Sequence, residues 1–244
     1  MQRGPRDHAG RCVVLTVALS LAGTACTGVA DPEQAATRPS EAAASPSAPT
    51  RAAPAPETVL RSAAGRQYQI RVTGDWTTVT ALGPHGEPQL QTFGALGRYA
   101  APQVVPGGPL EGSSPDGRWL VLEAQTPAPQ ETSNFLVLTS ELQREHEPVV
   151  LPGHFTFDAW SPSGDVLYLV EHKPPAGSGH YVVRAYDMKT QSLRPQPVAD
   201  KRNLEEEMAG QPVARAATAD GVVVATLCMR PAHDDEHGPF VHVL

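Results

Sequence analysis

The sequence contains no run of lysine or arginine. Its 19 basic residues are outnumbered by 26 acidic ones, so the 244-residue chain carries a formal net charge of −7. Nucleic-acid binding depends on clustered positive charge that neutralises phosphates and releases their counterions. We therefore expect no nucleic-acid partner.

Helical periodicity is also nearly absent from the sequence. The 25 prolines and 21 glycines are too many for a helical protein, because proline removes a backbone donor and glycine weakens a helix interior. Only residues 201–209 have the composition of a short helix or charged loop. The composition favours one globular domain of turn-rich β structure.

Motifs that carry catalysis or nucleotide binding are missing as well. The chain has no Gly-x-Ser-x-Gly elbow and no Gly-x-Gly-x-x-Gly or Walker-type loop. Asp116, Asp165 and Asp220 lie in turn sequences and are interpreted as turn residues. We expect no enzyme activity, no catalytic residue and no cofactor.

The N-terminus has the three parts of an export signal, which we assign to residues 1–25. Arg3, Arg6 and Arg11 precede an apolar run over 13–23, and small residues then lead to Cys26. The run is too short for a transmembrane helix, which takes about 20 residues. One interpretation is a secretory signal that is cleaved elsewhere and leaves Cys26 as an unmodified thiol.

Gly23-Thr24-Ala25-Cys26 resembles the lipobox of bacterial lipoproteins, with Gly23 where that family usually has leucine. The resemblance implies that Cys26 becomes the lipidated first residue of the mature protein. The membrane would then be a partner through this lipid, and the protein would lie on the extracytoplasmic face of the cell membrane. Heavy use of Ala, Pro, Gly and Arg suggests a GC-rich, actinobacterial genome.

The chain between the signal and the folded part has the composition of a tether. In residues 31–56, alanine, proline, serine and threonine make up 20 of 26 positions. Such a segment buries too little apolar surface to offset its chain entropy. We therefore assign 26–57 to a lipidated N-terminus with a disordered linker, and 58–244 to the folded domain.

Of the three cysteines, Cys12 would leave with the signal and Cys26 would be acylated. Cys228 is then alone in the mature domain, and an intrachain disulfide is not possible. It lies in the apolar stretch 222–229, where a small buried hydrophobic residue is a better interpretation than a nucleophile.

Alternating and apolar runs predict strands throughout the folded part. The predicted strands are 67–72, 76–82, 89–93, 118–124, 134–139, 148–151, 155–160, 165–171, 181–186, 195–198, 213–218, 222–229 and 240–244.

A tight turn that feeds an apolar strand recurs in the sequence. Its copies are Ser114-Pro115-Asp116-Gly117, Ser161-Pro162-Ser163-Gly164 and the degraded Thr218-Ala219-Asp220-Gly221. Pro162 follows Pro115 by 47 residues, and Gly221 follows Gly164 by 57. These intervals match the roughly 40 to 50 residues of propeller repeats if 200–210 is an insertion.

These turns resemble the signature of WD40-like and TolB-like β-propellers over about residues 100–244. The middle unit also has Gly153-His154 and Tyr186-Asp187, where WD40 blades carry Gly-His and Trp-Asp. The resemblance implies an all-β, propeller-like array of four-stranded antiparallel blades. Counting strands gives three to four blades, fewer than a closed propeller usually has.

Two packing expectations follow from this architecture. Inner-strand residues should be buried between blades, namely Leu120, Val121 or Leu122, Leu167, Leu169, Val223 and Leu227. The last strand should not be left with an open edge. We expect 240–244 to pair with 67–72 or 76–82, or to be covered by a second chain.

The leading functional hypothesis is a surface-tethered lipoprotein that acts as a binding or scaffold module without catalysis. Its partner would be a protein, peptide or glycan on a propeller face. One alternative is a metal-binding or metal-sensing lipoprotein that uses His233, Asp235 and His237 in the C-terminal loop. Another is a fragment of a longer propeller enzyme.

Overall fold

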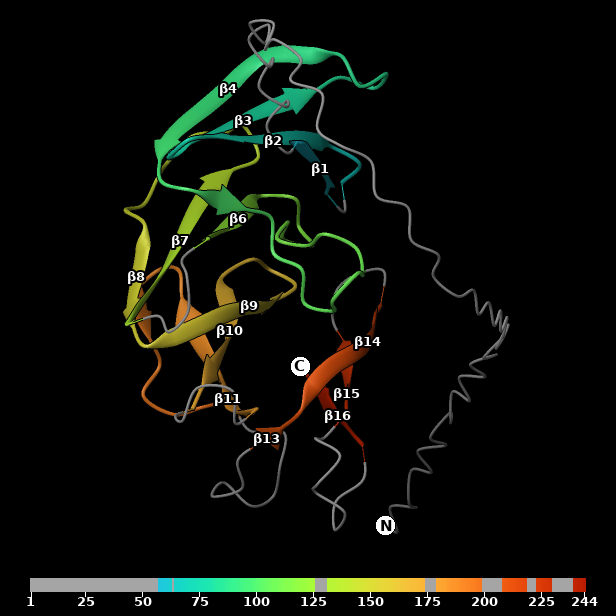
Figure 1. Ribbon diagram of the computed structural model, residues 1–244, viewed down its shortest axis with the longest axis vertical. Helices are drawn as coiled ribbons and strands as arrows, with labels where there is room; N and C mark the ends of the chain where they lie inside the picture. The colour runs from blue at the N-terminus through green and yellow to red at the C-terminus, as the bar shows by residue number, and fades with distance from the viewer. Residues whose placement is uncertain are drawn as a thin grey trace, which may run out of the picture. The chain divides into compact units, whose positions relative to one another are not determined.

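The computed structural model describes residues 57–62, 64–125, 131–173, 179–198, 208–218, 223–229 and 239–244. They form four antiparallel sheets that follow one another along the chain (Figure 1). The predicted signal, Cys26 and the linker lie outside the described residues. Within the described part, no helix is long and apolar enough to cross a membrane.

Each sheet is built from consecutive strands. Sheet A contains β1 (Glu57–Arg61), β2 (Gln67–Thr73), β3 (Trp76–Leu82) and β4 (Pro88–Leu96), and sheet B contains β5 (Tyr99–Ala100), β6 (Trp119–Ala124), β7 (Thr132–Thr139) and β8 (Val149–Pro152). Sheet C contains β9 (His154–Trp160), β10 (Val166–His172), β11 (His180–Asp187) and β12 (Ser192–Leu193), with β13 (Met208–Ala209) paired to β11. Sheet D contains β14 (Gln211–Ala217), β15 (Val224–Met229) and β16 (Phe240–Val243).

The predicted all-β class and the blade-like sheets are confirmed, with local differences. The segment 195–198 is not a strand, because only Val198 makes an isolated bridge, to Val183. At the end of the predicted helix or charged loop, Met208–Ala209 is a short strand, and 201–207 lie outside the described residues. The N-terminal strands form a complete four-stranded sheet, since β1 adds to the three predicted ones.

The recurring turn has the same hydrogen bonds in sheets B, C and D. The first turn residue donates its N–H to the carbonyl five residues later, and its hydroxyl accepts that residue's N–H. The pairs are Ser114 with Trp119, Ser161 with Val166, and Thr218 with Val223, and the hydroxyl contacts measure 2.9, 3.0 and 3.0 Å. The turn residues of the third copy between these ends lie outside the described part.

Sheet A contains a further copy of this turn that the sequence search missed. The Ser62 N–H donates to the Arg66 carbonyl, and the Ser62 hydroxyl accepts the Arg66 N–H, so the two ends are four residues apart instead of five. The Gly65 N–H donates to the Ser62 carbonyl. The shared signal is Ser/Thr-x-x-Gly, and this copy has neither the proline nor the aspartate that mark the others. In all four sheets, therefore, the same type of turn leads into the second strand.

Three apolar clusters join the sheets in chain order. Leu60, Ile70 and Val79 of sheet A pack with Leu120 and Leu138 of sheet B. A second cluster joins sheets B and C, and a third joins sheet C to sheet D. Because β6 has neighbours on both faces, its residues Trp119 to Leu122 are all buried, as predicted for Leu120 to Leu122.

Burial in β15 corrects the prediction for sheet D. Val223 is 41% exposed and Leu227 is half-buried, whereas Val224, Thr226 and Cys228 are buried. Only one face of β15 packs on sheet C, so its side chains alternate between buried and exposed. Leu167 and Leu169 are fully buried, as predicted.

The predicted pairing of the last strand with the N-terminal strands is wrong. Among the described strands, β16 pairs with β15, while β2 and β3 pair with each other and with β1 and β4. Local hairpin pairing completes sheet A and leaves neither β2 nor β3 with an open edge.

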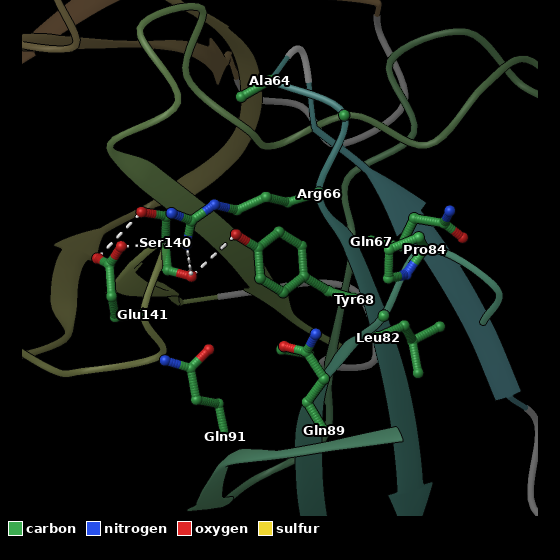
Figure 2. Close-up of a pocket in the computed structure, with 13 residues that line it drawn as sticks. Ala64, Arg66, Gln67, Tyr68, Leu82, Pro84, Gln89, Gln91, Ser140 and Glu141 are labelled. Carbon is green, nitrogen blue, oxygen red and sulfur yellow. Dashed lines mark hydrogen bonds and ion pairs between the residues drawn. The ribbon is translucent and has the colours of Figure 1, made fainter. Parts of the chain in front are cut away.

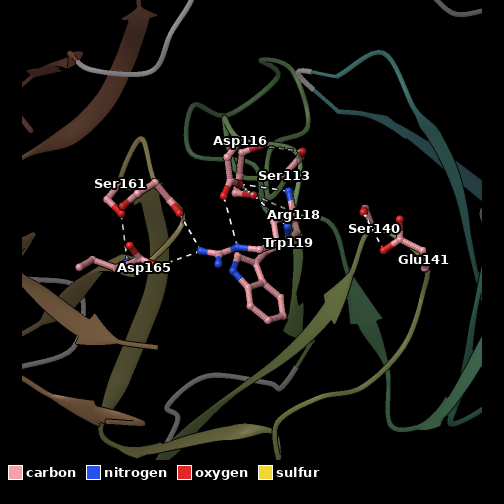
Figure 3. Close-up of polar contacts among 11 residues, drawn as sticks. Ser113, Asp116, Arg118, Trp119, Ser140, Glu141, Ser161 and Asp165 are labelled. Atoms are coloured by element: carbon pink, nitrogen blue, oxygen red, sulfur yellow. Dashed lines mark hydrogen bonds and ion pairs between the residues drawn. The ribbon is translucent and has the colours of Figure 1, made fainter. Parts of the chain in front are cut away.

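Arginines link the turns of neighbouring sheets. The Arg118 guanidinium donates to the Ser163 carbonyl at 2.7 Å and to Asp165 Oδ1 at 2.8 Å, and so joins the turn of sheet B to that of sheet C (Figure 3). Arg66, in the turn before β2 of sheet A, donates to the Ser140 carbonyl and to Glu141 in the turn after β7 of sheet B, each at 3.0 Å (Figure 2). Asp116 and Asp165 are turn residues, as predicted.

Candidate binding site

The junctions between sheets A and B and between sheets B and C share a hydroxyl bridge. The Thr77 hydroxyl donates to the Gly97 carbonyl at 2.7 Å and accepts the Tyr99 N–H at 2.8 Å. Ser133 makes the same two contacts with Gly153 and Phe155, at 2.9 and 2.7 Å. Thr77 is the second residue of β3 and Ser133 is the second residue of β7, the third strands of sheets A and B. In both cases this hydroxyl bonds to the segment that enters the next sheet.

The junction between sheets C and D lacks this bridge. The equivalent second residue of β11 is Tyr181, and the segment entering sheet D is Gly210-Gln211-Pro212. Gly210 keeps the positive φ of Gly97 and Gly153 (140°, against 116° and 107°), but Pro212 has no N–H to donate. The Tyr181 hydroxyl instead contacts His242 Nδ1 at 3.1 Å and Cys228 Sγ at 3.2 Å.

A cavity of about 260 Å³ lies at this altered junction. Its lining combines apolar side chains with a larger set of polar and ionisable ones that converge from several strands, and convergent polar groups are a feature of ligand sites. The polar and ionisable residues are Gln103, Glu123, His154, Thr156, Asp158, His172, Tyr181, Thr226, Cys228 and His242. The apolar residues are Pro102, Val104, Phe157, Val170 and Pro212.

A β-bulge places Asp158 in this lining. In the register of β9 with β10, Ala159 is opposite Tyr168 and Phe157 is opposite Leu169, so Asp158 is an extra residue without a partner. Bulges re-aim side chains in this way and are common beside binding sites. The Asp158 side chain is completely buried.

Asp158 is held by two cations from sheet D. Arg215 donates to Asp158 Oδ1 at 2.9 Å and also to the Asp158 backbone carbonyl, and its Nε lies 3.1 Å from Glu111 Oε2. His242 Nε2 lies 3.2 Å from Asp158 Oδ2, but without the alignment of a hydrogen bond. Burial opposes ionisation of Asp158, yet His242 and Arg215 outweigh it and lower the pKa of the carboxyl.

The same contacts keep His242 protonated. Burial alone would lower its pKa, but Asp158, and then Cys228, raise the pKa of the imidazole to about 9. Burial also raises the pKa of Glu111, against the effect of Arg215. Sheet D is therefore attached to sheet C by a charge cluster that is almost entirely buried.

Glu123 has a different electrostatic environment on another wall of the cavity. It lies on β6 and accepts a hydrogen bond from the Phe157 N–H of β9. Burial raises the pKa of its carboxyl to about 7, and the Phe157 N–H opposes this only in part. Within the described part of the chain, no cation forms an ion pair with Glu123.

Two histidines that line the same cavity as Glu123 are neutral at physiological pH. His154 and His172 are opposite each other on β9 and β10, and their rings stack with centroids 4.3 Å apart. Burial, and then the charge of His154, lower the pKa of His172 to about 4, and burial also lowers the pKa of His154. The Thr156 hydroxyl is 3.0 Å from His172 Nε2.

The dipeptides that resembled the WD40 pattern lie in two different places. His154 belongs to the cavity wall, whereas Asp187 accepts the N–H groups of Lys189 and Thr190 in the turn after β11. Asp187 also pairs with Arg194 at 3.0 Å. The two dipeptides of sheet C are therefore not part of one hydrogen-bonded group: the first lies at the cavity and the second stabilises the turn after β11.

The predicted site residues lie mostly elsewhere. Cys26, His233, Asp235 and His237 are outside the described residues, so lipidation and metal binding stay predictions. Among the residues that are described, no three His, Cys, Asp or Glu side chains are grouped so as to hold a metal ion. Sequence reasoning found none of the cavity residues, because they come from strands far apart in the chain.

Cys228 is buried, as predicted for a small hydrophobic residue. The prediction overlooked its surroundings, since Tyr181 and His242 lie next to it although the sequence places no histidine near it. Antiparallel pairing of β15 with β16 brings His242 opposite Thr226, two residues from Cys228. Only the strand register could have revealed this proximity.

A larger cavity of about 460 Å³ lies between sheet A and the turn after β7 (Figure 2). Arg66 and Tyr68 point toward the Ser140 carbonyl there, and Glu141 pairs with Arg66. Their polar groups satisfy one another and hold sheet A on sheet B. The cavity at the junction of sheets C and D is therefore the better candidate binding site.

Four blade-like antiparallel sheets, packed in chain order, define an all-β protein of the β-propeller-like class. No family model and no curated protein matches the sequence. Among solved structures, TolB from Acinetobacter baumannii is similar, with 15% identity over 78% of this chain and 43% of that chain and a TM-score of 0.47.

Two further solved structures are similar at the same distant level. An uncharacterized protein from Listeria monocytogenes EGD-e has 13% identity over 76% of this chain and 61% of its own, with a TM-score of 0.43. A protein from Lactobacillus plantarum has 12% identity over 76% and 55%, with a TM-score of 0.34. This chain thus spans about half the length of the structures that it matches.

Proposed function

We propose that this protein is a membrane-tethered binding lipoprotein that holds a small solute, or a small exposed group of a larger partner, at the junction of sheets C and D. The observation that carries the proposal is the cavity at this junction. A cavity that brings apolar side chains together with ionisable groups of shifted pKa is a usual feature of a binding site.

The electrostatics of the cavity favour binding over catalysis. His242, the imidazole nearest to Cys228, is protonated at neutral pH and held by Asp158, so it does not accept a proton from a nucleophile. Because its pKa is lowered to about 4, His172 is a weak base at neutral pH. Neutral hydrogen-bonding groups and fixed charges suit recognition of a ligand.

The tether in this proposal is the lipid on Cys26 with the linker that follows it. Replacement of Cys26 with alanine should abolish acyl labelling and release the protein to the medium. Growth with labelled palmitate, followed by fractionation, measures both effects. The tether is wrong if the variant stays in the membrane and the wild type takes up no palmitate.

The binding site is tested with the full-length chain in detergent and a panel of small amines, carboxylates, amides, alcohols and sugars, by ligand-observed NMR. Val104→Trp places an indole at the cavity wall and should remove the binding seen with the wild type. Val150→Trp, at an exposed position on β8, is the control and should bind normally. Binding that Val104→Trp leaves intact, or a panel without any binder, rules out this site.

A further inference from the structure

The lining of the cavity is rich in hydrogen-bond acceptors and contains no lysine or arginine among the described residues. Its two acids, Glu123 and Asp158, differ in how they are neutralised. Asp158 has Arg215 and His242 as partners, whereas Glu123 accepts a hydrogen bond from the Phe157 N–H. One carboxyl group in the wall therefore has no cationic partner within the described ranges of the chain.

The other groups that line the cavity do not supply the missing charge. From β9 and β10, His154 and His172 are neutral imidazoles, each with a ring nitrogen that is able to accept a hydrogen bond. From β11 and β15, the Tyr181 hydroxyl and the Cys228 sulfur contact each other. The positive charge of His242 on β16 is already balanced by Asp158.

A second observation concerns Asp158 itself. Its Oδ2 is buried and has no aligned hydrogen bond, although His242 Nε2 is 3.2 Å away. A carboxylate oxygen accepts more than one hydrogen bond, so the described protein groups do not use the full capacity of Oδ2. The cavity thus combines the Glu123 carboxyl, which has no cationic partner among the described residues, with a buried carboxylate oxygen that has no aligned hydrogen bond.

We propose that the cavity binds an organic cation, a primary ammonium or guanidinium group on a small aliphatic body, with the cationic group against Glu123. Such a group carries several N–H donors, which match the excess of acceptors in the wall. A charge that enters an apolar site is stable only when it is paired, and the Glu123 carboxylate provides that pair. The aliphatic body would contact Val104, Val170 and Pro212.

Binding should be linked to a proton at Glu123. Without ligand, burial keeps this carboxyl protonated below about pH 7, so a cation binds only as the proton leaves. Affinity should therefore fall as the pH decreases from 7 to 5, by up to about tenfold per unit for one coupled proton. At pH 6 the protein should release close to one proton for each cation bound.

The test uses the full-length chain in detergent and two matched pairs of probes: methylguanidinium with N-methylurea, and n-butylammonium with n-butanol. Within each pair the molecules have similar shapes and differ in charge. Calorimetry at pH 6 in two buffers of different ionisation enthalpy measures affinity and proton release together. We expect each cation to bind at least tenfold more tightly than its neutral counterpart.

Glu123→Gln keeps an acceptor for the Phe157 N–H but removes the charge. It should weaken binding of both cations at least tenfold and abolish proton release. Glu145→Gln, at an exposed acid in the loop between β7 and β8, is the matched control and should change neither. If Glu123→Gln does not fold, the wild-type comparison of cations with neutral molecules still decides the matter.

The inference rests on the proposed function, but different results would overturn the cation specificity and the binding function. Equal binding of neutral and cationic probes, or cation binding that Glu123→Gln leaves unchanged, overturns the inference and keeps a binding protein. Absence of binding by any class of small molecule overturns both. Cation binding that is lost in Glu123→Gln and kept in Glu145→Gln supports both.

Discussion

At the scale of single residues, one hydroxyl sets each repeated turn. Ser62, Ser114, Ser161 and Thr218 all accept the N–H that closes the turn before the second strand of their sheet. Asparagine or aspartate would also bond the local backbone, but a short hydroxyl fits where the residue itself is buried, as Ser114 and Ser161 are.

Removal of this hydroxyl should be measurable in one turn. Ser161→Ala leaves the Val166 N–H without its acceptor, so we expect a loss of about 1 kcal/mol in the free energy of unfolding. Urea denaturation followed by circular dichroism measures the loss. Ser163→Ala, an exposed serine of the same turn, should change the value by less than about 0.5 kcal/mol. Equal effects of the two variants would contradict this role of the hydroxyl.

His242 makes stability depend on pH in a defined window. Its pKa is about 9 in the folded chain and near 6.5 when unfolded, so the folded state holds the extra proton between these values. The stabilisation is complete below about pH 6.5 and is lost as the pH rises through about 9. The slope reaches at most about 1.4 kcal/mol per pH unit.

The window from pH 8 to 9 isolates this histidine. Glu123 titrates between its unfolded value and about pH 7, and His172 between about pH 4 and its unfolded value, so both changes are nearly complete by pH 8. Urea unfolding at pH 8, 8.5 and 9 should show stability falling in the wild type and a flat profile in His242→Asn. His85→Gln, at an exposed position in a loop, should keep the wild-type slope.

At the scale of elements, the strands differ in whether one face or both faces are buried. The β6 strand lies between two apolar clusters and is buried along a continuous run, whereas β15 packs on one face and alternates. Both strands are apolar in sequence, so their patterns predicted strands but not the number of neighbouring sheets. That number depends on the position of the sheet in the array.

The inner strand of sheet C provides the packing test. Leu167 is fully buried in the cluster shared by sheets B and C, so Leu167→Ala should cost about 2 to 5 kcal/mol. Chemical denaturation gives the free energy of unfolding. Leu90→Ala, at a fully exposed leucine on β4, is the matched control and should cost less than about 0.5 kcal/mol. A loss below 0.5 kcal/mol at Leu167 would mean that the strand register is wrong.

At the scale of the whole domain, the junctions between sheets are held by different means. Sheets A, B and C are joined by hydroxyl bridges, by apolar clusters and by the exposed arginines Arg66 and Arg118. Sheet D is joined to sheet C by the buried contacts of Arg215, Asp158 and His242. A buried charge that loses its partner costs far more than an exposed one.

The two kinds of arginine should therefore differ in effect. Arg215→Ala leaves Asp158 buried with less compensation and should cost about 3 to 5 kcal/mol, whereas Arg118→Ala should cost about 1 kcal/mol or less. Hydrogen exchange should then be faster in β14 to β16 than in β2 and β3 of the Arg215→Ala protein. Similar losses in the two variants, or uniform exchange, would argue against this attachment of sheet D.

The sequence was sufficient to predict the all-β class, most strands and the recurring turn, because these depend on short-range chemistry. Side-chain alternation, a hydroxyl at the first turn position and a glycine at the fourth all act within a few residues. The copy at Ser62 was missed because it has neither the proline nor the aspartate that mark the other copies.

The candidate site and the pairing of the ends were decided by tertiary structure. A bulge in β9 places Asp158 in the cavity lining, and hairpin pairing of β15 with β16 brings His242 close to Cys228. Pro212 lacks the backbone N–H that binds the bridging hydroxyl at the other two junctions. These residues are separated by tens of positions in the chain, and each contact depends on how whole sheets pack. Burial then shifts the pKa values of Glu123 and His172, a property that no residue has until the fold removes its water.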